Sequence, residues 1–368
     1  MVVLINGSLA ESLVNFRANL ISTLVARGYH VHVSAPAISE AVRIKLQKLG
    51  ATAHQVRLER TGLNPLGDLR YYQDLRRIIK KIRPDFVLGY TAKPNIWGSL
   101  AATHSGVQSA SMVTGLGFGF IEGAGVRRRL VQRVQHWLYA RATKRNSVVI
   151  FQNPDDERDF VAAGCLDDPA KARRVNGSGV DTAFFAPVPL PPEPRFLMIA
   201  RLLVSKGVRE FAEAARLVRA ERPGCDFALA GFLDPGPDGI SAGELELWRA
   251  QGIRYLGPLE DIRPAMADAS IYVLPSYREG APRTVLEAMA MARPTITTDV
   301  PGCRETVTDG VNGFLVPARD SAALADAMQR LAADSTLRQT MGAAGRRLAL
   351  SRYSIDEVSA ATIRALNL

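Results

Sequence analysis

The stretch IYVLPSYREGAPRTVLEAMA, residues 271–290, decides the fold. It begins with four apolar residues, 271–274, which are typical of a buried strand. A tight turn containing Gly280 follows, and Pro282 then opens a helical pattern that runs to about residue 292, because proline is well accommodated at the first position of a helix. A strand that leads through a short turn into a helix is the repeating unit of a parallel α/β sheet.

Short β-branched runs alternate with helical patterns along the whole chain. Helices are predicted, for example, over 16–27, 69–82 and 208–220. This alternation is typical of βα units that build parallel sheets, so the predicted fold class is α/β. The strands are predicted at 2–5, 30–34, 86–89, 111–113 and 148–152 in the first half, and at 195–199, 227–230, 253–256, 271–274 and 294–298 in the second.

A chain of 368 residues is too long for one ordinary core and suits two domains. The segment 186–194, APVPLPPEP, contains five prolines, which cannot donate backbone hydrogen bonds and favour an extended linker. We therefore expect a Rossmann-like domain over 1–186, a linker over 187–194, and a second Rossmann-like domain over 195–350. Residues 351–368 are expected to form a helix that crosses back to the first domain. Two doubly wound domains would face each other across a cleft, with ligands outside the carboxyl ends of the strands.

The formal net charge of +10 is unevenly distributed. Residues 1–190 carry 25 Lys and Arg against 14 Asp and Glu, whereas the rest of the chain is nearly neutral. A basic first domain attracts polyanions such as phosphorylated substrates and anionic lipid headgroups. No recognition helix, zinc finger or paired-aromatic motif accompanies this charge, so no nucleic acid is expected as a partner.

The location of the protein is predicted from what the sequence lacks. No window approaches the roughly 18 uninterrupted apolar residues of a membrane-spanning helix. The first residues, MVVLING, indicate a strand and not a signal peptide, so a cytoplasmic protein is expected. The cysteines, Cys165, Cys225 and Cys303, lie far apart, which argues against a disulfide framework and a zinc site.

Two acids eight residues apart mark the turn and helix of the opening stretch. Glu279 lies in the turn and Glu287 about one and a half helical turns beyond Pro282, so both can border one cavity. Carboxylates accept hydrogen bonds from sugar hydroxyls, and a helix start with Gly280 beside it suits a diphosphate. The alternative is that Glu287 is a solvated helix residue and that Glu279 only complements the helix dipole.

Two bases follow the first strand of the second half. Arg201 and Lys206 leave the predicted strand 195–199, with Ser205 and Gly207 beside them. Cations at a strand exit can stabilise a leaving diphosphate as its negative charge grows. Surface bases are common, so each residue alone is equally compatible with a structural role.

These motifs resemble the retaining family 4 glycosyltransferases of the GT-B fold. The resemblance rests on Arg201-x4-Lys206, Glu279-x7-Glu287 and LEAMA at 286–290, and it extends to NGSGVD at 176–181 and DGVNGFLVP at 309–317. It implies that Glu279, Arg201 and Lys206 are catalytic. It also implies a nucleotide-sugar site formed by Gly7, Arg201, Lys206, Gly257, Glu279, Gly280, Ala281, Pro282 and Glu287. No Asp-x-Asp motif is present, so a UDP-sugar co-substrate is expected without a metal or other cofactor.

The first half narrows the resemblance to a branch that extends undecaprenyl-diphosphate-linked oligosaccharides and includes a bacillosamine-linked N-acetylgalactosaminyltransferase. The segments TAKPNIWG at 91–98 and VTGLGF at 113–118 carry this similarity. It implies acceptor binding by Lys93, Asn95 and Thr114; an ordinary loop lysine is the alternative for Lys93. Asn6-Gly7-Ser8 is shorter than the family's glycine-rich loop. Thr114 stands where the family often has a histidine.

The expected activity is transfer of an N-acetylhexosamine from a UDP-sugar to a polyprenyl-diphosphate-linked saccharide, with retention, in surface polysaccharide or glycan biosynthesis. A UDP-sugar 2-epimerase of the same fold is one alternative, although the histidines are scattered without an added carboxylate cluster. A non-catalytic nucleotide-sugar-binding protein is another. Gly115, Gly117 and Gly119 do not form the GxGxxG dinucleotide motif.

The segment 122–145 predicts a basic helix with an apolar stripe. Val126, Leu130, Val134, Trp137 and Leu138 form the stripe, and arginines surround it. Such a helix favours peripheral attachment to the anionic inner face of the cell membrane. The alternative is that the stripe packs on the first sheet while the arginines face water.

Overall fold

The computed structural model describes residues 1–59, 64–116, 120 and 126–368, without the side chains of 126–128. Gly117, Gly119 and the first residues of the predicted basic helix, 122–125, therefore lie outside the described residues. Two compact units are present: one comprises 1–178 with 358–368, and the other 179–357. The expected C-terminal segment 351–368 is thus divided between the units, since its last eleven residues belong to the first.

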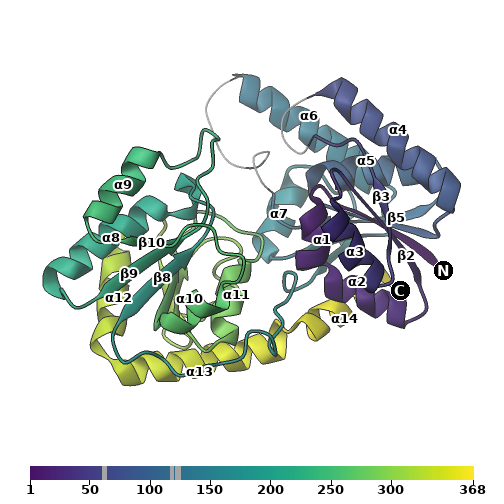
Figure 1. Cartoon of the computed structure of the whole chain (residues 1–368). Helices are drawn as coiled ribbons and strands as arrows, with labels where there is room; N and C mark the ends of the chain where they lie inside the picture. Colours follow the sequence, from purple (N-terminus) through teal and green to yellow (C-terminus); the bar gives the residue numbers. More distant parts are fainter. Residues whose placement is uncertain (60–63, 117–119, 121–125) are drawn as a thin grey trace. The chain divides into compact units, whose positions relative to one another are not determined.

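The first unit contains a seven-stranded parallel sheet (Figure 1). Its order is β3-β2-β1-β4-β5-β6-β7, and the direction of winding reverses between β1 and β4. Five of these strands were predicted, β5 only in its last three residues, whereas β3 and β7 were not predicted, because both are short and partly polar. The strands are β1 (Val2–Asn6), β2 (His30–Ala35), β3 (Thr52–Gln55), β4 (Phe86–Tyr90), β5 (Gln108–Val113), β6 (Val148–Phe151) and β7 (Ala172–Arg174).

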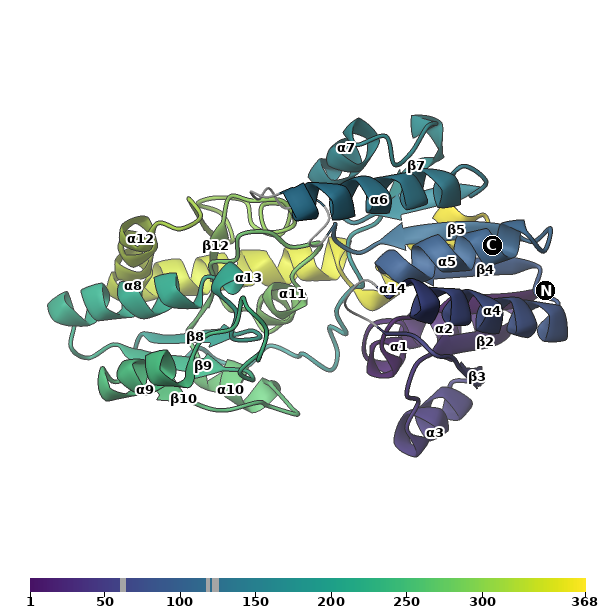
Figure 2. The same ribbon diagram turned by 90° about the horizontal axis from the view of Figure 1, so that it is seen from above.

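Helices cover both faces of this first sheet (Figure 2). Alternate strand residues such as Val3 and Leu4 enter different clusters, so each face has its own core. One face packs against α1 (Ala10–Phe16), α2 (Ala18–Ala26), α3 (Glu40–Lys48) and α14 (Ile355–Leu366), and the other against α4 (Pro65–Ile82), α5 (Ala92–Thr103), α6 (Val126–Thr143) and α7 (Pro154–Ala162). The predicted helix 16–27 corresponds to α2, and a break at Arg17 separates it from α1, which was not predicted.

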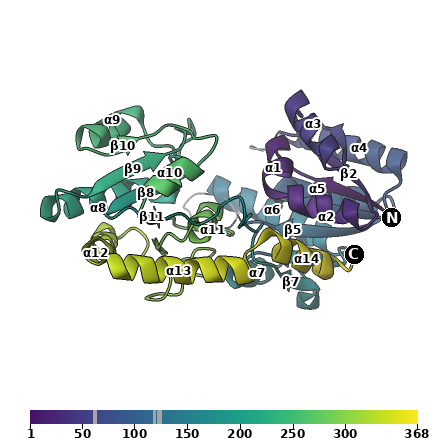
Figure 3. The ribbon, with the colours of Figure 1, turned by 60° about the horizontal axis from the view of Figure 1, so that its bottom comes forward.

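The second unit repeats this architecture with six parallel strands in the order β10-β9-β8-β11-β12-β13. Helix α8 packs on α12, and α11 packs on α13 (Figure 3). The strands are β8 (Arg195–Ile199), β9 (Asp226–Ala230), β10 (Arg254–Tyr255), β11 (Ile271–Leu274), β12 (Thr295–Thr298) and β13 (Gly313–Val316). The helices are α8 (Val208–Glu221), α9 (Ala242–Ala250), α10 (Arg263–Asp268), α11 (Arg283–Ala290), α12 (Ser321–Ala333) and α13 (Ser335–Arg352).

The proline-rich segment lies inside the second unit, and the change of unit comes earlier, at 178/179. Backbone carbonyls of this proline-rich segment accept hydrogen bonds from two buried arginines. Arg293 donates to the carbonyls of Val188 and Pro189, and Arg338 donates to that of Pro192. Segment 187–194 is therefore anchored on the second unit, whereas its composition predicts an extended linker between the domains.

Replacing Arg293 by Ala is expected to destabilise the second unit by about 3 kcal/mol, because Arg293 is fully buried and its charge-assisted bonds also satisfy the carbonyls of Met266, Ala267 and Met291. Urea unfolding followed by Trp248 fluorescence measures this, in a background where the other tryptophans, Trp97 and Trp137, are Phe. The exposed Arg347→Ala should change stability by less than about 0.5 kcal/mol. Equal unfolding midpoints for the two variants would contradict the anchoring role.

Candidate functional site

The predicted acids and bases of the second unit lie at the point where its sheet reverses direction. Strands β8 and β11 are neighbours, and the chain winds outward from them in opposite directions. Arg201 and Lys206 follow β8, whereas Glu279 follows β11. In open α/β sheets, ligands bind outside the carboxyl ends of the strands at such a reversal.

Glu279 and Lys206 are in direct contact at this edge. Lys206 Nζ donates to Glu279 Oε1 at 2.5 Å, and Ser276 Oγ donates to the same oxygen at 2.7 Å. Both charged side chains are largely covered, so the pair is less screened than a surface ion pair. The structure therefore brings together two residues that are 73 positions apart and that the sequence assigned to one site.

Gly207 makes this contact possible. Its φ is +72°, and a Cβ at this position would lie 2.1 Å from the carbonyl oxygen of Pro275. The Tyr277 amide then donates to the Ser205 carbonyl at 2.9 Å. The short 3-10 turn Val204–Lys206 thus lies against the turn that carries Glu279, and the sequence analysis missed both Gly207 and Ser276 as positioning residues.

The turn before α11 is fixed from a second direction. The Glu279 amide donates to the Pro301 carbonyl at 3.0 Å, and Gly302, with φ of +83°, packs directly on the Glu279 carbonyl. Pro282 is the N-cap of α11 with extended ψ of 102°, and the helix begins at Arg283. The prediction that Pro282 is the first helical residue is therefore wrong by one position, because the chain is still turning at Pro282.

Glu287 lies on the buried side of α11, so the alternative that it is a solvated helix residue is wrong. Its side chain is only 7% exposed, and Arg283 Nε donates to its Oε1 at 2.7 Å. Burial raises the pKa of Glu287 to about 7, although the charge of Arg283 opposes this shift. Glu287 can therefore change its charge near neutral pH.

The charges of both acids influence one buried hydroxyl, that of Tyr272. Burial raises the pKa of Tyr272, and the charges of Glu287 and Glu279 raise it further. Tyr272 Oη donates to the Ile199 carbonyl at 3.1 Å, so it also ties β11 to the end of β8. The predicted pair of acids therefore shares one edge of the sheet.

Arg201 is at the outer part of this edge. Its Nη1 lies 3.3 Å from Asp234 Oδ2, and its side chain is 45% exposed. Asp234 Oδ1 also accepts from the Gly236 amide, as in an Asx turn. Gly257, with φ of +70°, follows β10, and its carbonyl accepts from the Gly231 amide. Gly280 and Ala281 lie in the turn between Glu279 and Pro282.

The charges of this edge form three pairs of opposite sign: Lys206 with Glu279, Arg283 with Glu287, and Arg201 with Asp234. Carboxylates can accept hydrogen bonds from sugar hydroxyls, and the bases can bind phosphate oxygens. In the part of the chain that the structure describes, no three His, Cys, Asp or Glu side chains are grouped as metal ligands.

The first unit has a comparable edge, where its sheet reverses between β1 and β4. Gly7 follows β1, and a Cβ there would lie 2.3 Å from Tyr90 Oη at the end of β4. Thr91 Oγ1 donates to Ser8 Oγ at 2.9 Å across the same reversal. Glycine is thus required at position 7 because of the close approach of Tyr90.

The three predicted acceptor residues have different environments. Asn95 is fully buried, and its side-chain amide hydrogen-bonds to both the carbonyl and the backbone amide of Met112. It therefore fixes α5 on β5 and is not available to bind the saccharide acceptor. Lys93 lies in the first turn of α5, not in a loop, with Nζ 2.8 Å from Asp68 Oδ1. Thr114 is half-buried directly after β5.

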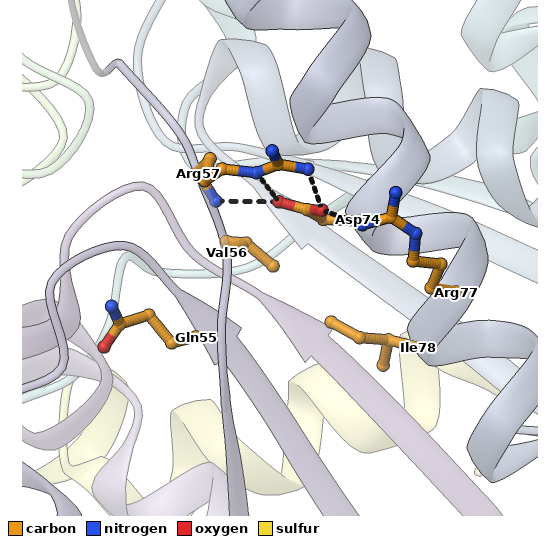
Figure 4. Close-up of a pocket in the computed structure, with 6 residues that line it drawn as sticks. All are labelled: Gln55, Val56, Arg57, Asp74, Arg77 and Ile78. Carbon is orange, nitrogen blue, oxygen red and sulfur yellow. Dashed lines mark hydrogen bonds and ion pairs between the residues drawn. The ribbon is translucent and has the colours of Figure 1, made fainter.

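A cavity of about 390 Å³ lies elsewhere in the first unit, between the end of β3 and α4 (Figure 4). Asp74 accepts from Arg57 and Arg77, and hydrogen bonding from Arg57 lowers the pKa of Asp74. None of the predicted site residues lines it. This cavity is therefore separate from the edge that carries the acids and bases.

Two doubly wound units, one with paired acids and bases at its sheet reversal, define the class of GT-B glycosyltransferases. Two family models match the chain: the glycosyl transferase 4-like domain over residues 14–170 and glycosyl transferases group 1 over 193–334. The chain belongs to this glycosyltransferase family, and it is an enzyme that transfers a sugar.

Individual relatives agree with this family. The chain is 29% identical over 342 residues to the N,N'-diacetylbacillosaminyl-diphospho-undecaprenol alpha-1,3-N-acetylgalactosaminyltransferase of Campylobacter jejuni, covering 89% of this chain and 88% of the relative. It is 27% identical over 290 residues to the UDP-Gal:alpha-D-GlcNAc-diphosphoundecaprenol alpha-1,3-galactosyltransferase of Escherichia coli, covering 75% and 73%. The structure of Anabaena HepE in complex with UDP and glucose has a TM-score of 0.81 at 17% identity, covering 100% and 99%.

Gly207→Ala is expected to destabilise the second unit by about 2–3 kcal/mol, because alanine is strained at positive φ and its Cβ would collide with the Pro275 carbonyl. The Trp248 unfolding assay measures this change. Gly243→Ala is the matched control, since Gly243 lies in α9 with nothing within 4 Å of the added Cβ, and alanine should stabilise there. Wild-type stability in Gly207→Ala would contradict the role of Gly207.

Proposed function

We propose that the enzyme transfers a sugar, an N-acetylhexosamine, from a UDP-sugar to a polyprenyl-diphosphate-linked saccharide, with retention at the anomeric carbon. The observation that carries the donor site is the pairing of acids with bases at the reversal between β8 and β11. The C. jejuni and E. coli relatives are named for undecaprenyl-diphosphate acceptors. The role of the product in surface polysaccharide or glycan biosynthesis follows from such acceptors.

Each residue of the edge has a role in this proposal. Glu287 accepts the ribose hydroxyls, and Glu279 contacts the transferred sugar. Arg201 and Lys206 bind the diphosphate and stabilise the negative charge that grows on it as the bond from the anomeric carbon to its oxygen breaks. The acceptor hydroxyl attacks the same face, and its proton passes to the departing diphosphate. The reaction requires no metal or other cofactor, because the two bases take the place of the cation.

Glu287→Gln is expected to raise the donor KM by at least about tenfold, because an amide replaces the ionised acceptor for the ribose hydroxyls. Glu279→Gln should lower kcat more than it raises KM. UDP release is measured with UDP-N-acetylgalactosamine, UDP-N-acetylglucosamine and UDP-galactose on extracted lipid-linked acceptor. Glu246→Gln, on the exposed part of α9, is the control. An unchanged donor KM in Glu287→Gln would refute the ribose assignment.

We also propose that the first unit attaches to the anionic inner face of the cell membrane through α6. Leu130, Val134 and Trp137 repeat at helical spacing and are 62%, 44% and 55% exposed. The opposite side of α6, with Tyr139 and Ala142, is buried in the core. The alternative that the whole stripe packs on the sheet is therefore wrong for these three residues; Leu138 does pack on the core, and the side chain of Val126 lies outside the described ones.

The charge of the exposed surface fits an anionic bilayer. Arg129, Arg133 and Arg141 are exposed along α6, and Arg141 lies 4.6 Å over the Trp137 ring. Trp and Arg together are typical of the membrane interface. Among the described helices, none is sufficiently long and apolar to span a bilayer. The outer face of α4 adds further exposed bases: Arg70, Arg76, Arg77, Lys80 and Lys81.

The triple variant Leu130→Gln, Val134→Gln, Trp137→Gln is expected to bind anionic vesicles at least about tenfold more weakly than the wild type, because it loses apolar contact with the acyl boundary. Co-sedimentation with phosphatidylglycerol vesicles at low salt measures this binding. Leu247→Gln, an exposed apolar residue of α9, should bind like the wild type. Equal recovery of the wild type with neutral vesicles would exclude the electrostatic part of the attachment.

A further inference from the structure

Glu287 occupies an unusual position for a carboxylate that must be ionised. It is almost completely covered by protein, and a buried carboxylate without a partner loses most of its hydration. Within the described part of the chain, one basic side chain pairs with it: Arg283, four residues earlier on the same helix, contacts it at 2.7 Å. Residues four apart on a helix lie one above the other, so this contact needs no distant element to form.

We propose that Arg283 is a positioning residue for the donor, which favours the ionised form of Glu287 and directs its carboxylate toward the ribose. This inference rests on the proposed donor role of Glu287. Arg283 itself need not touch the donor. It acts through Glu287, because the ion pair with its Nε fixes one carboxylate oxygen and compensates the charge that burial would otherwise remove.

Among the described groups around Glu287, Arg283 is the one that favours its ionised form. Burial is the largest influence on the pKa of Glu287, and Arg283 is the charge that opposes it. From β11, the titratable group facing Glu287 is the Tyr272 hydroxyl, which is neutral and donates to a backbone carbonyl. The bases Arg201 and Lys206 each have an acid of their own, Asp234 and Glu279.

The sign of the pH effect follows from these contacts. The pKa of Glu287 is about 7 with Arg283 present, so the ionised form that accepts ribose hydroxyls grows as pH rises through 7. Donor affinity should rise over the same range. Without Arg283 the opposing charge is lost and the pKa of Glu287 rises further, so the gain in affinity is delayed to higher pH.

The experiment measures the Kd of UDP by calorimetry between pH 6 and 9.5 for the full chain. Arg283→Gln and Arg283→Leu should both move the midpoint upward by at least about one pH unit, which makes UDP binding at least about fivefold weaker at pH 7 and restores it near pH 9. Arg283→Lys should stay close to the wild type. The kcat with saturating UDP-sugar and acceptor at pH 9 should change by less than about threefold.

Two controls separate this effect from others. Glu287→Gln carries no titratable group at this position, so its pH curve reports the titration of UDP itself. Arg249→Gln removes a matched arginine that pairs with Glu246 on the exposed part of α9, and it should leave the curve unchanged. Near-UV circular dichroism tests that each variant is folded, and the use of both Gln and Leu at position 283 guards against loss of one variant.

The outcomes distinguish this proposal from the proposed function. Equal UDP affinity in Glu287→Gln and the wild type at pH 8 would refute the donor role of Glu287 itself. If Glu287→Gln binds weakly but the curves of Arg283→Gln and Arg283→Leu superimpose on that of the wild type, the role of Arg283 is refuted while the donor site stands. Weak binding in Arg283→Gln that does not recover at high pH would also refute it, because a purely structural defect is independent of pH.

Discussion

The close contact between Gly207 and the Pro275 carbonyl is the constraint on which the second unit's edge depends. Two loops leave neighbouring strands there, and any side chain at position 207 would force them apart. Because they touch, the Lys206 ammonium reaches Glu279, and the Tyr277 amide finds a carbonyl partner. The chemistry of the edge therefore begins with a backbone contact, and the charged residues follow from it.

The three ion pairs of this edge differ in how strongly they are held. Arg201 and Asp234 are the most exposed, and such surface pairs contribute about 0–1 kcal/mol. Lys206 with Glu279 is more covered, and Glu287 is nearly buried against Arg283. An incoming diphosphate can therefore take Arg201 from Asp234 at small cost, whereas the two carboxylates that would receive hydroxyls stay in place. The gradient of burial divides the edge into an exchangeable outer part and a preorganised inner part.

How far the sequence predicts this molecule depends on the range of the interaction. Strand and helix patterns are local, so ten of the thirteen described strands and the β11-α11 unit were predicted, whereas β3, β7 and β13 were not. Arg283 could have been recognised from its spacing of four before Glu287. Asn95 was misjudged because its partner, Met112, comes from another element. The proline-rich segment was misjudged for the same reason, since Arg293 and Arg338 lie far along the chain. The short polar strands β3 and β7 carry no clear pattern of their own.

Some bases of the first unit are paired with acids, whereas others are exposed on its surface. Lys93 is compensated by Asp68 and Arg57 by Asp74, so these bases contribute little to the outer field. Further exposed arginines and lysines lie on the outer faces of α4 and α6, where they surround exposed Leu69 and Trp137. Charge on a helix surface is screened within about 8 Å at physiological salt, so it acts chiefly on a surface that lies against the helix. In the proposed function, this charge serves attachment to an anionic membrane, whereas the nucleotide sugar binds through the few charges of the nearly neutral second unit.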